Sequence, residues 1–331
     1  MARTRGIRRW AVAALLAAAA VAVVAFGAVR PWRSAPPIRE PVGAFVPSGP
    51  SGRAVLWAVG DGADGGAAGR AVAARIRAGR VDRFLYLGDV YRSGIVGLVR
   101  ADGSATDYRD RYAPLYGELA ARTAPTPGNH EWPQRGEGYE PYWRSVTGRT
   151  PPAYYSFKIA GWQILSLNSE APHGRGSAQL RWLARRLARP GTCRLAFWHR
   201  PRFSAGRHGD QADVAPLWNA LRGRAVLVVA GHDHDMQRFR PIDGMTQVVS
   251  GAGGHGHYAL RRDPRLAFGD DRRYGALRID LGPGGARLRF VAAGGRVLDA
   301  STVRCRQVPG VPINKDPQDP STELPPQDTS A

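Results

Sequence analysis

Short apolar runs alternate with amphipathic stretches through the middle of the chain. Several runs have the length and aliphatic content of buried strands, namely 54–59, 83–87, 194–198 and 225–230. Apolar residues at helical spacing predict amphipathic helices over 66–79 and 177–188. In the second of these, Leu180, Leu183 and Leu187 share one face, and Ser177 is placed to cap the N-terminus.

Strand patterns then dominate the later part of the sequence, with few helices between them. They cover 154–160, 162–168, 246–251, 275–281, 286–292 and 296–301. Helix and strand together predict an α/β domain with mixed sheets, two of which pack face to face with helices outside.

The first 30 residues predict an export segment. Basic residues precede an uncharged apolar run over 10–29, which as a helix would span roughly 30 Å, about one bilayer core. We favour an uncleaved signal anchor, with a cleaved signal peptide as the alternative and the Arg8-Arg9 pair as a weak twin-arginine signal. Each interpretation puts the rest of the chain outside the cytoplasm, either at the cell membrane or secreted.

The sequence between and beyond these parts predicts one folded domain with flexible flanks. Residues 31–52 are Pro-rich and predict a semi-rigid linker, whereas 307–331 are polar and Pro-rich and predict a disordered tail. The domain should therefore cover 53–306. Cys193 and Cys305 form no metal-type cluster, and because both lie in the exported domain we expect a disulfide between them.

Charge adds little to this picture. The formal net charge is +20, and nearly all of the positive charge is Arg. The Arg residues are spread along the chain, with no dense run interleaved with aromatics, so we expect no nucleic-acid partner. We expect membrane attachment through the N-terminal apolar segment.

Metal-ligand residue types follow the predicted buried strands. Ligands in open α/β sheets collect at the carboxyl ends of strands, so one crevice could receive side chains from five segments. The candidates are Asp61, Asp89, Asn129, His130, His199, His232 and His234.

This mixture of donors has a chemical meaning. Imidazole with carboxylate suits Fe, Mn or Zn. Six or seven ligands are too many for one tetrahedral ion but fit two metals about 3.5–4 Å apart that share a carboxylate. Such a pair supports in-line displacement at phosphorus by a metal-bound hydroxide. A Gly-Asp or GNHE motif alone is typical of a turn, whereas His232-Asp233-His234 places two imidazoles on one side of an extended segment, and the combination of all five motifs is specific.

The motif series matches a known family. GD (60–61), GD (88–89), GNHE (128–131), WHR (198–200) and GHDH (231–234) resemble the calcineurin-like metallophosphoesterases over roughly 53–306. The stretch 177–209 is similar to exported bacterial members related to purple acid phosphatases. The resemblance implies a four-layer α/β/β/α sandwich of two mixed β-sheets flanked by helices, with a dinuclear metal centre.

The same resemblance implies a role for each matching position. Asp61 and His234 would bind the first metal, and Asp89 would bridge both metals. His130 would contact the phosphoryl group or protonate the leaving oxygen. The second metal would take three further ligands: Asn129, His199 and His232.

The first site departs from the family pattern. Many members carry a His ligand two residues after the first Asp, but here Asp61 is followed by Gly62 and Ala63. Purple acid phosphatases use a Tyr three residues after the bridging Asp, and here Tyr91 lies two residues after Asp89. Tyr91 is the candidate replacement ligand, and the alternative is a packed aromatic near a first site that keeps an open position. A phenolate ligand favours Fe(III), so we expect Fe paired with Fe, Zn or Mn.

Other residues near the motifs are candidates for substrate contact. His208 follows the fourth motif, and Arg200 could face the phosphate, with a surface ion pair as the alternative. His255 and His257 lie in a Gly-rich loop that either borders the pocket or forms a plain turn. The aromatic residues that could wall the pocket, or belong to the core, are Trp132 and Tyr139.

These observations predict a metal-dependent phosphoric ester hydrolase. Its substrate would be a phosphorylated small molecule or lipid, and a phosphomonoesterase resembling acid phosphatases is preferred. The alternative is a phosphodiesterase acting on nucleotides, phospholipid headgroups or cell-envelope intermediates. A rival of another class is a membrane-tethered, non-catalytic binding module. We expect a monomer.

Overall fold

The computed structural model describes residues 36–91, 103–188 and 193–305. The expected export segment, the first residues of the linker and the expected tail lie outside the described residues. Among the helices that are described, none combines the length and the apolar character needed to cross a bilayer.

One mixed sheet has the strand order β13-β12-β11-β1-β2-β3. β1, β2 and β3 run parallel, whereas β11 pairs with β1 antiparallel and continues into the β11–β13 meander. We call this sheet A. Its strands are β1 (Ala54–Val59), β2 (Arg83–Tyr86), β3 (Thr123–Pro125), β11 (Gly275–Gly282), β12 (Gly285–Ala292) and β13 (Val297–Arg304).

The second mixed sheet, sheet B, has the order β10-β8-β9-β7-β6-β5-β4. Its central strands β5, β6, β7 and β9 are parallel, and antiparallel strands flank them on both sides. The strands are β4 (Tyr155–Ile159), β5 (Trp162–Ser166), β6 (Arg194–Phe197), β7 (Leu227–Ala230), β8 (Met236–Phe239), β9 (Thr246–Ser250) and β10 (Leu266–Asp270).

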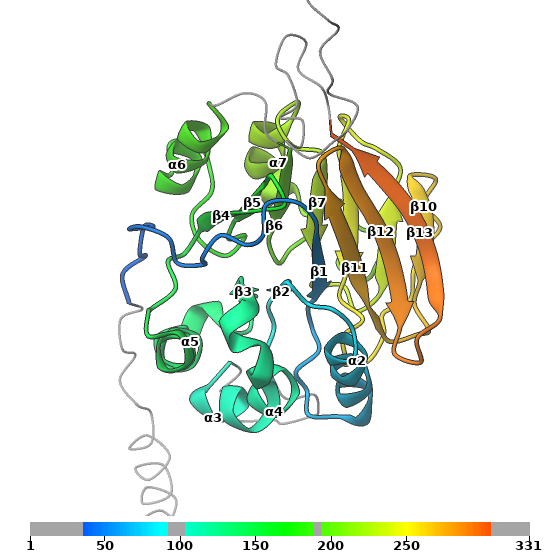
Figure 1. Cartoon of the computed structure of the whole chain (residues 1–331), viewed down its shortest axis with the longest axis horizontal. Helices are drawn as coiled ribbons and strands as arrows, with labels where there is room; N and C mark the ends of the chain where they lie inside the picture. The colour runs from blue at the N-terminus through cyan, green and yellow to red at the C-terminus, as the bar shows by residue number, and fades with distance from the viewer. Residues whose placement is uncertain (1–35, 92–102, 189–192, 306–331) are drawn as a thin grey trace, which may run out of the picture. The chain divides into compact units, whose positions relative to one another are not determined.

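Three apolar clusters stack the two sheets and the helices into layers (Figure 1). The largest contains residues of both sheets, such as Leu56 and Leu195, and so lies between them. A second packs the outer face of sheet A against α2 (Ala67–Arg77) and the helical region that follows β2. A third packs sheet B against α6 (Ala178–Leu187) and α7 (Ala215–Leu221). The predicted four-layer α/β/β/α sandwich is therefore confirmed.

The region between β2 and β4 is built from short helical turns. It contains α3 (Ala105–Asp107), a π-helical turn (Tyr108–Tyr112), α4 (Ala113–Tyr116), two 3-10 turns (Gly117–Arg122 and Trp132–Gln134) and α5 (Tyr139–Thr147). A further 3-10 turn, Ala212–Val214, precedes α7. Tyr112 and Tyr116 of this region pack on Tyr86 of β2, and Tyr108 packs on Tyr112. Aromatic packing therefore holds this region against the last residue of β2.

The predicted elements agree with the structure where burial is strong. The run 54–59 forms β1, and Ser177 caps α6 by accepting the backbone N–H of Leu180 at 3.2 Å. Neither β8 nor β10 was predicted, because each is short and mixes polar with apolar residues. α7 was also missed, because its seven residues include a proline.

Residues 37–52, which the sequence predicts to be linker, pack on the folded domain. Val46 is buried. Two backbone hydrogen bonds link this segment to β4 and the residue after it: Gly49 donates to the carbonyl of Lys158, and Ala160 donates to the carbonyl of Pro50. The segment forms no helix or strand, as expected from its prolines. It is part of the compact unit that begins at Pro37.

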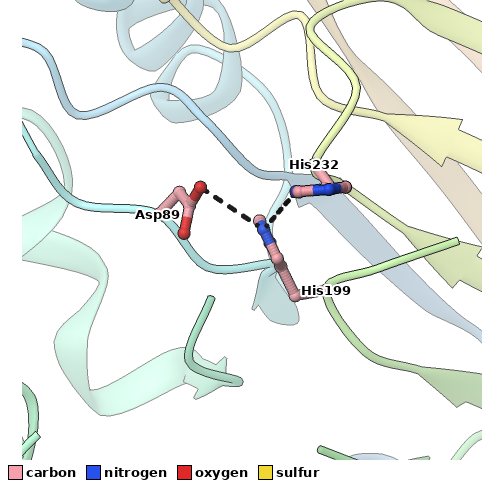
Figure 2. A group of neighbouring side chains, drawn as sticks. All are labelled: Asp89, His199 and His232. Atoms are coloured by element: carbon pink, nitrogen blue, oxygen red, sulfur yellow. Dashed lines mark hydrogen bonds and ion pairs between the residues drawn. The ribbon is translucent and has the colours of Figure 1, made fainter. Parts of the chain in front are cut away.

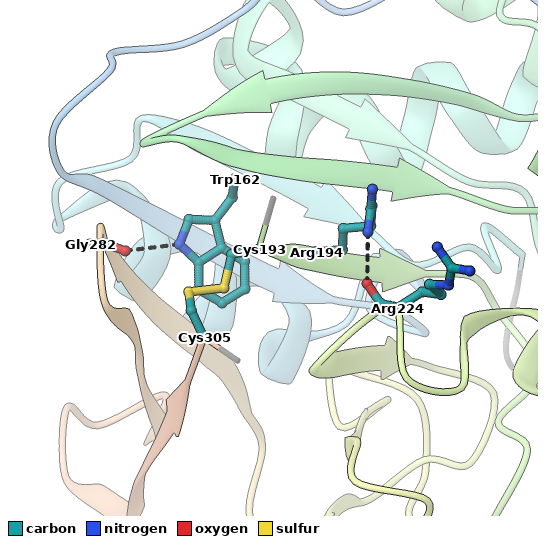
Figure 3. The surroundings of a disulfide bond; sticks show 6 residues. All are labelled: Trp162, Cys193, Arg194, Arg224, Gly282 and Cys305. Atoms are coloured by element: carbon teal, nitrogen blue, oxygen red, sulfur yellow. Dashed lines mark hydrogen bonds between the residues drawn. A yellow bond between two sulfur atoms is a disulfide. The ribbon is translucent and has the colours of Figure 1, made fainter. Parts of the chain in front are cut away.

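A disulfide joins Cys193 and Cys305, as predicted, with the Cα atoms 5.4 Å apart (Figure 3). Cys193 precedes β6 of sheet B, and Cys305 follows β13 of sheet A. The indole of Trp162 in β5 also donates to the carbonyl of Gly282 in β11 at 2.9 Å. The two sheets are thus tied together at the end of β6 opposite to His199.

Candidate metal centre

Four donor atoms from four segments meet at the carboxyl ends of β2, β3, β6 and β7. Nε2 of His199 lies 3.3 Å from Oδ2 of Asp89 and 3.1 Å from Nδ1 of His232 (Figure 2). Oδ1 of Asn129 lies 3.2 Å from the same Nε2. We call these four residues the His199 group. Their spacing suits one ion, since the Asp89, His199 and His232 donor atoms all lie within 4.8 Å of one another.

A second set of donors lies beside it. Oδ1 of Asp61 is 3.6 Å from Nε2 of His234, and the Tyr91 hydroxyl is 3.3 Å from the same nitrogen. We call these three residues the His234 group. The backbone N–H of His232 donates to Oδ2 of Asp61 at 2.8 Å, so the two groups share a structural link.

Backbone carbonyls orient two of the imidazoles. Nδ1 of His199 lies 2.7 Å from the carbonyl oxygen of Leu87, and Nδ1 of His234 lies 2.8 Å from that of Gly256. Because a carbonyl oxygen only accepts, each Nδ1 must carry the hydrogen. When the ring is neutral, the lone pair of each Nε2 then faces the cluster, which is the arrangement that metal-binding histidines adopt.

Three of these residues have left-handed backbone. φ is 56° at Asp61, 63° at Asp89 and 73° at His232, each at the point where the chain leaves a strand. Such geometry costs free energy for residues with a Cβ and persists where the surroundings enforce it. Gly128 shows how tight the packing is, because a Cβ there would lie 2.0 Å from Oδ1 of Asp89. The surroundings therefore hold these three residues in a strained backbone conformation.

The buried charges fit a cation. Burial raises the pKa of Asp61 well above its usual value, and the neighbouring Asp89 raises it further, although His199 opposes this. Burial lowers the pKa of His199, but the Asp89 and Asp61 carboxylates outweigh it and raise that pKa to about 10. Oδ1 of Asp61 accepts no hydrogen bond within the part of the chain that the structure describes. Protons would be needed to balance these carboxylates, and metal ions would take the same place.

Glu131 is a functional residue that sequence reasoning did not assign. Its buried Oε2 accepts the backbone N–H groups of Asp89 at 2.9 Å and Gly128 at 3.0 Å, and the Tyr108 hydroxyl donates to Oε1 at 3.3 Å. Burial, and then the charge of Asp89, raises the Glu131 pKa to about 8. The signal was its position directly after Asn129-His130 in the GNHE motif. It holds together the two loops that present Asp89 and Asn129.

His130 lies at the solvent side of the centre. Its Nε2 is 3.8 Å from Oδ2 of Asp89, and its side chain is 27% exposed, whereas that of His199 is fully buried. Its ring stacks on Tyr91 with centroids 3.7 Å apart, and His255 stacks on the other face of Tyr91 at 3.9 Å. Tyr91 is therefore held between two imidazoles, next to His234.

The two candidate substrate contacts differ in their surroundings. The His208 ring stacks on His232 with centroids 4.2 Å apart, so it lies beside the His199 group. The Arg200 guanidinium donates to both oxygens of Glu170, at 2.9 and 3.1 Å. A substrate phosphate would have to compete with that carboxylate for Arg200.

The remaining candidates divide between the site and the core. His257 places Nδ1 3.0 Å from the carbonyl of His234 and stacks on Tyr274. Trp132 packs against the Arg135 guanidinium, and Tyr139 is buried in the cluster beneath sheet A. The Gly-rich loop thus borders the His234 group, whereas Tyr139 is a core residue.

Comparison with known proteins agrees with the motifs. Residues 57–236 match the family model described as calcineurin-like phosphoesterase, and this range includes all five motifs. The chain belongs to this family. The resemblance seen in the sequence is confirmed, and metal-dependent phosphoester chemistry is the family's activity. Members of the family hold a dinuclear metal centre, for which the clustered donors are the candidate here.

Individual relatives are more distant. Purple acid phosphatase 21 of Arabidopsis thaliana is 30% identical over 162 residues, which cover 41% of this chain and 37% of the relative. The chain thus spans well under half of that protein. Purple acid phosphatase PPD1 of yellow lupin has a TM-score of 0.60 at 18% identity, covering 78% of this chain and 55% of its own. GAP50, the anchor in the inner membrane complex of Plasmodium, has a TM-score of 0.63 at 14% identity. The match covers 78% of this chain and 90% of GAP50. At these identities the solved structures share the fold.

Proposed function

We propose that the protein is a dinuclear-metal phosphomonoesterase. The observation that supports the proposal is the convergence of donor atoms from separate strand ends into two adjacent groups. The chain also belongs to a family that hydrolyses phosphoesters. The similarity to purple acid phosphatase 21 favours monoesters. No protein nucleophile is needed for this chemistry.

Each group would hold one metal. The His199 group supplies a carboxylate, an amide and two imidazoles, and the His234 group supplies a carboxylate, an imidazole and a phenol. Such donors suit Fe with Fe, Zn or Mn. When bound, the ions would neutralise phosphoryl charge and lower the pKa of a bound water. Asp89 is the candidate bridge, because its GD motif matches the position that bridges the two metals in the family the chain belongs to.

His130 is the candidate proton donor to the leaving oxygen. Its exposed imidazole lies at the edge of the centre, where a leaving group would depart toward solvent. Stacking on Tyr91 limits its rotation, so its Nε2 stays beside Asp89. General acid catalysis requires such a donor within hydrogen-bond reach of the reacting group.

A substrate panel with metal analysis tests this function. Purified protein should contain close to two metals per chain and should turn over 4-nitrophenyl phosphate faster than bis(4-nitrophenyl) phosphate. Faster turnover of the diester, or of a phospholipid headgroup, would favour the phosphodiesterase alternative. Two bound metals without turnover of any ester would instead favour a non-catalytic binding module.

Export is also part of the proposal. The disulfide between Cys193 and Cys305 supports it, because such bonds persist in oxidising compartments. The apolar run 10–29 would act as anchor or signal. Fractionation of producing cells, with protease added from outside, should find the domain accessible on the outer side of the membrane. Protection from the protease in intact cells would contradict this location.

A further inference from the structure

A surface loop beside the metal centre is held from below by buried side chains. We call residues 204–208, which follow His199 along the chain, the rim loop. The backbone N–H of Ala205 donates to Oε1 of Gln237 at 2.8 Å, and that of His208 donates to Oδ1 of Asp233 at 3.0 Å. Both acceptor residues are completely buried.

Ser204 completes this network. Its hydroxyl donates to Oδ2 of Asp233 and accepts from Nε2 of Gln237 and from the backbone N–H of Gly206, both at 2.9 Å. Breaking such bonds would leave buried polar groups unpaired, which is costly. The rim loop therefore keeps one backbone conformation. Because Asp233 lies between the ligands His232 and His234, the loop is tied directly to the metal centre.

The tip of the rim loop carries two side chains that lie beside the ligand histidines or their aromatic neighbour. The His208 ring stacks on His232 at 4.2 Å. The Arg207 guanidinium lies 5.3 Å from the ring centroid of Tyr258, and Tyr258 stacks on His234 at 4.1 Å. Arg207 thus stands one aromatic ring away from the His234 group.

The charge of Arg207 is not balanced locally. Two arginines near the loop are paired, Arg200 with Glu170 and Arg265 with Asp210 and Asp263. Within residues 36–91, 103–188 and 193–305, Arg207 has no acidic partner, and its guanidinium only overlies Tyr258. Arg261 lies beside it and donates to the Arg207 carbonyl at 3.3 Å. Two exposed guanidinium groups therefore share the rim.

We propose that Arg207, with Arg261 beside it, binds a second anionic group of the substrate. The substrate class is then a phosphate ester whose leaving group carries a further phosphate or carboxylate. This inference rests on the proposed function. Guanidinium groups form strong charged hydrogen bonds with either anion. The fixed loop and the Tyr258 ring reduce the entropy that Arg207 loses on binding.

Matched substrate pairs test this assignment on the metal-loaded protein. One pair is 4-carboxyphenyl phosphate with its neutral 4-carbamoyl analogue, and the other is propane-1,3-diol bisphosphate with the monophosphate. The ratio of kcat/KM within each pair should fall about tenfold in Arg207→Gln, the change expected from one charged hydrogen bond. Arg261→Gln should lower it less. Comparing the pairs tells whether carboxylate or phosphate is preferred.

Arg202→Gln is the control, since it removes the same charge from a neighbouring arginine that lies over Phe203 at 4.6 Å. It should leave both ratios unchanged. Equal ratios in wild type and Arg207→Gln, or an equal loss in Arg202→Gln, would overturn the proposal. If no ester is hydrolysed, the proposed function fails, and the ratios of Kd for the same pairs, measured by calorimetry, still decide whether Arg207 binds the second anion.

Discussion

The His199 group and the His234 group are built differently, although they lie side by side. Every residue of the His199 group follows a strand of sheet A or sheet B, and Asp89, His199 and His232 are buried. In the His234 group, Asp61 and His234 are buried as well, but Tyr91 is only partly buried. Strand register places the donors of the first group. The Tyr91 ring is instead held by stacking on His130 and on His255.

From this difference we expect the two sites to differ in metal affinity. Four preorganised donors lose little freedom on binding, because the sheets already hold them in place. The His234 group has three donors, one of which depends on side-chain stacking. We therefore expect the His199 group to bind its ion more tightly, and the following variants probe this difference.

Asp89→Ala should have the largest effect, because Asp89 is the proposed bridge between the two metals. Both metals should be lost, and turnover of 4-nitrophenyl phosphate should fall on the order of 10³-fold, since several kcal/mol of charge stabilisation disappear. Elemental analysis and steady-state kinetics measure this. Asp299→Ala, which removes an ion pair with Arg238 away from the centre, is the control. Two retained metals with normal activity would refute the bridge.

His199→Ala should separate the groups. One metal should leave the His199 group while the His234 group keeps its own, so metal content should fall to about one per chain and turnover roughly 10²-fold. Titration of metal-free protein with Zn²⁺ would count the remaining sites. Retention of two tight sites would show that His199 is not a ligand.

Tyr91→Phe should lower metal affinity only in the His234 group, which is expected to bind its ion less tightly. Loss of the hydroxyl near His234 should lower the affinity of one metal about 10- to 100-fold, which is typical for small changes around a metal ligand. Visible absorption of the iron form should also disappear if the phenolate binds Fe(III). Tyr274→Phe, whose ring stacks on His257, is the control. Unchanged absorption and affinity would exclude Tyr91 as a ligand.

Glu131→Gln should have the smallest effect on turnover. Its main effect should be on how the unfolding free energy changes with pH. The Glu131 pKa is raised from 4.5 to about 8, first by burial and then by Asp89. A raised pKa stabilises the fold fully below the unfolded value and loses this contribution as pH rises toward 8. Between pH 5 and 8, metal-free wild type should therefore lose unfolding free energy relative to the variant, by about 1 kcal/mol per pH unit.

Urea denaturation of both metal-free proteins across this range gives the measurement. A difference between them that stays constant with pH would mean that Glu131 keeps its charge when folded. Metal-loaded protein should show a smaller difference, because the ions offset the charge of Asp89.

The buried strands and the motif residues could be predicted from the sequence because each follows a local rule. β1 is a continuous apolar run, and Asp61 and Asp89 come directly after such runs. β8, with its polar Gln237 and Arg238, follows no such rule, since its position depends on pairing with β9 and β10.

The sequence by itself determined the fold class, the family and the candidate ligand types, because apolar periodicity and motif order are properties of the chain. Only the tertiary structure decided which atoms meet. Glu131 reaches the Asp89 loop from 42 positions away, and Arg207 reaches Tyr258 through a loop anchored on Asp233. These contacts follow from sheet register and from burial of polar groups, which bring distant residues together without leaving a local pattern.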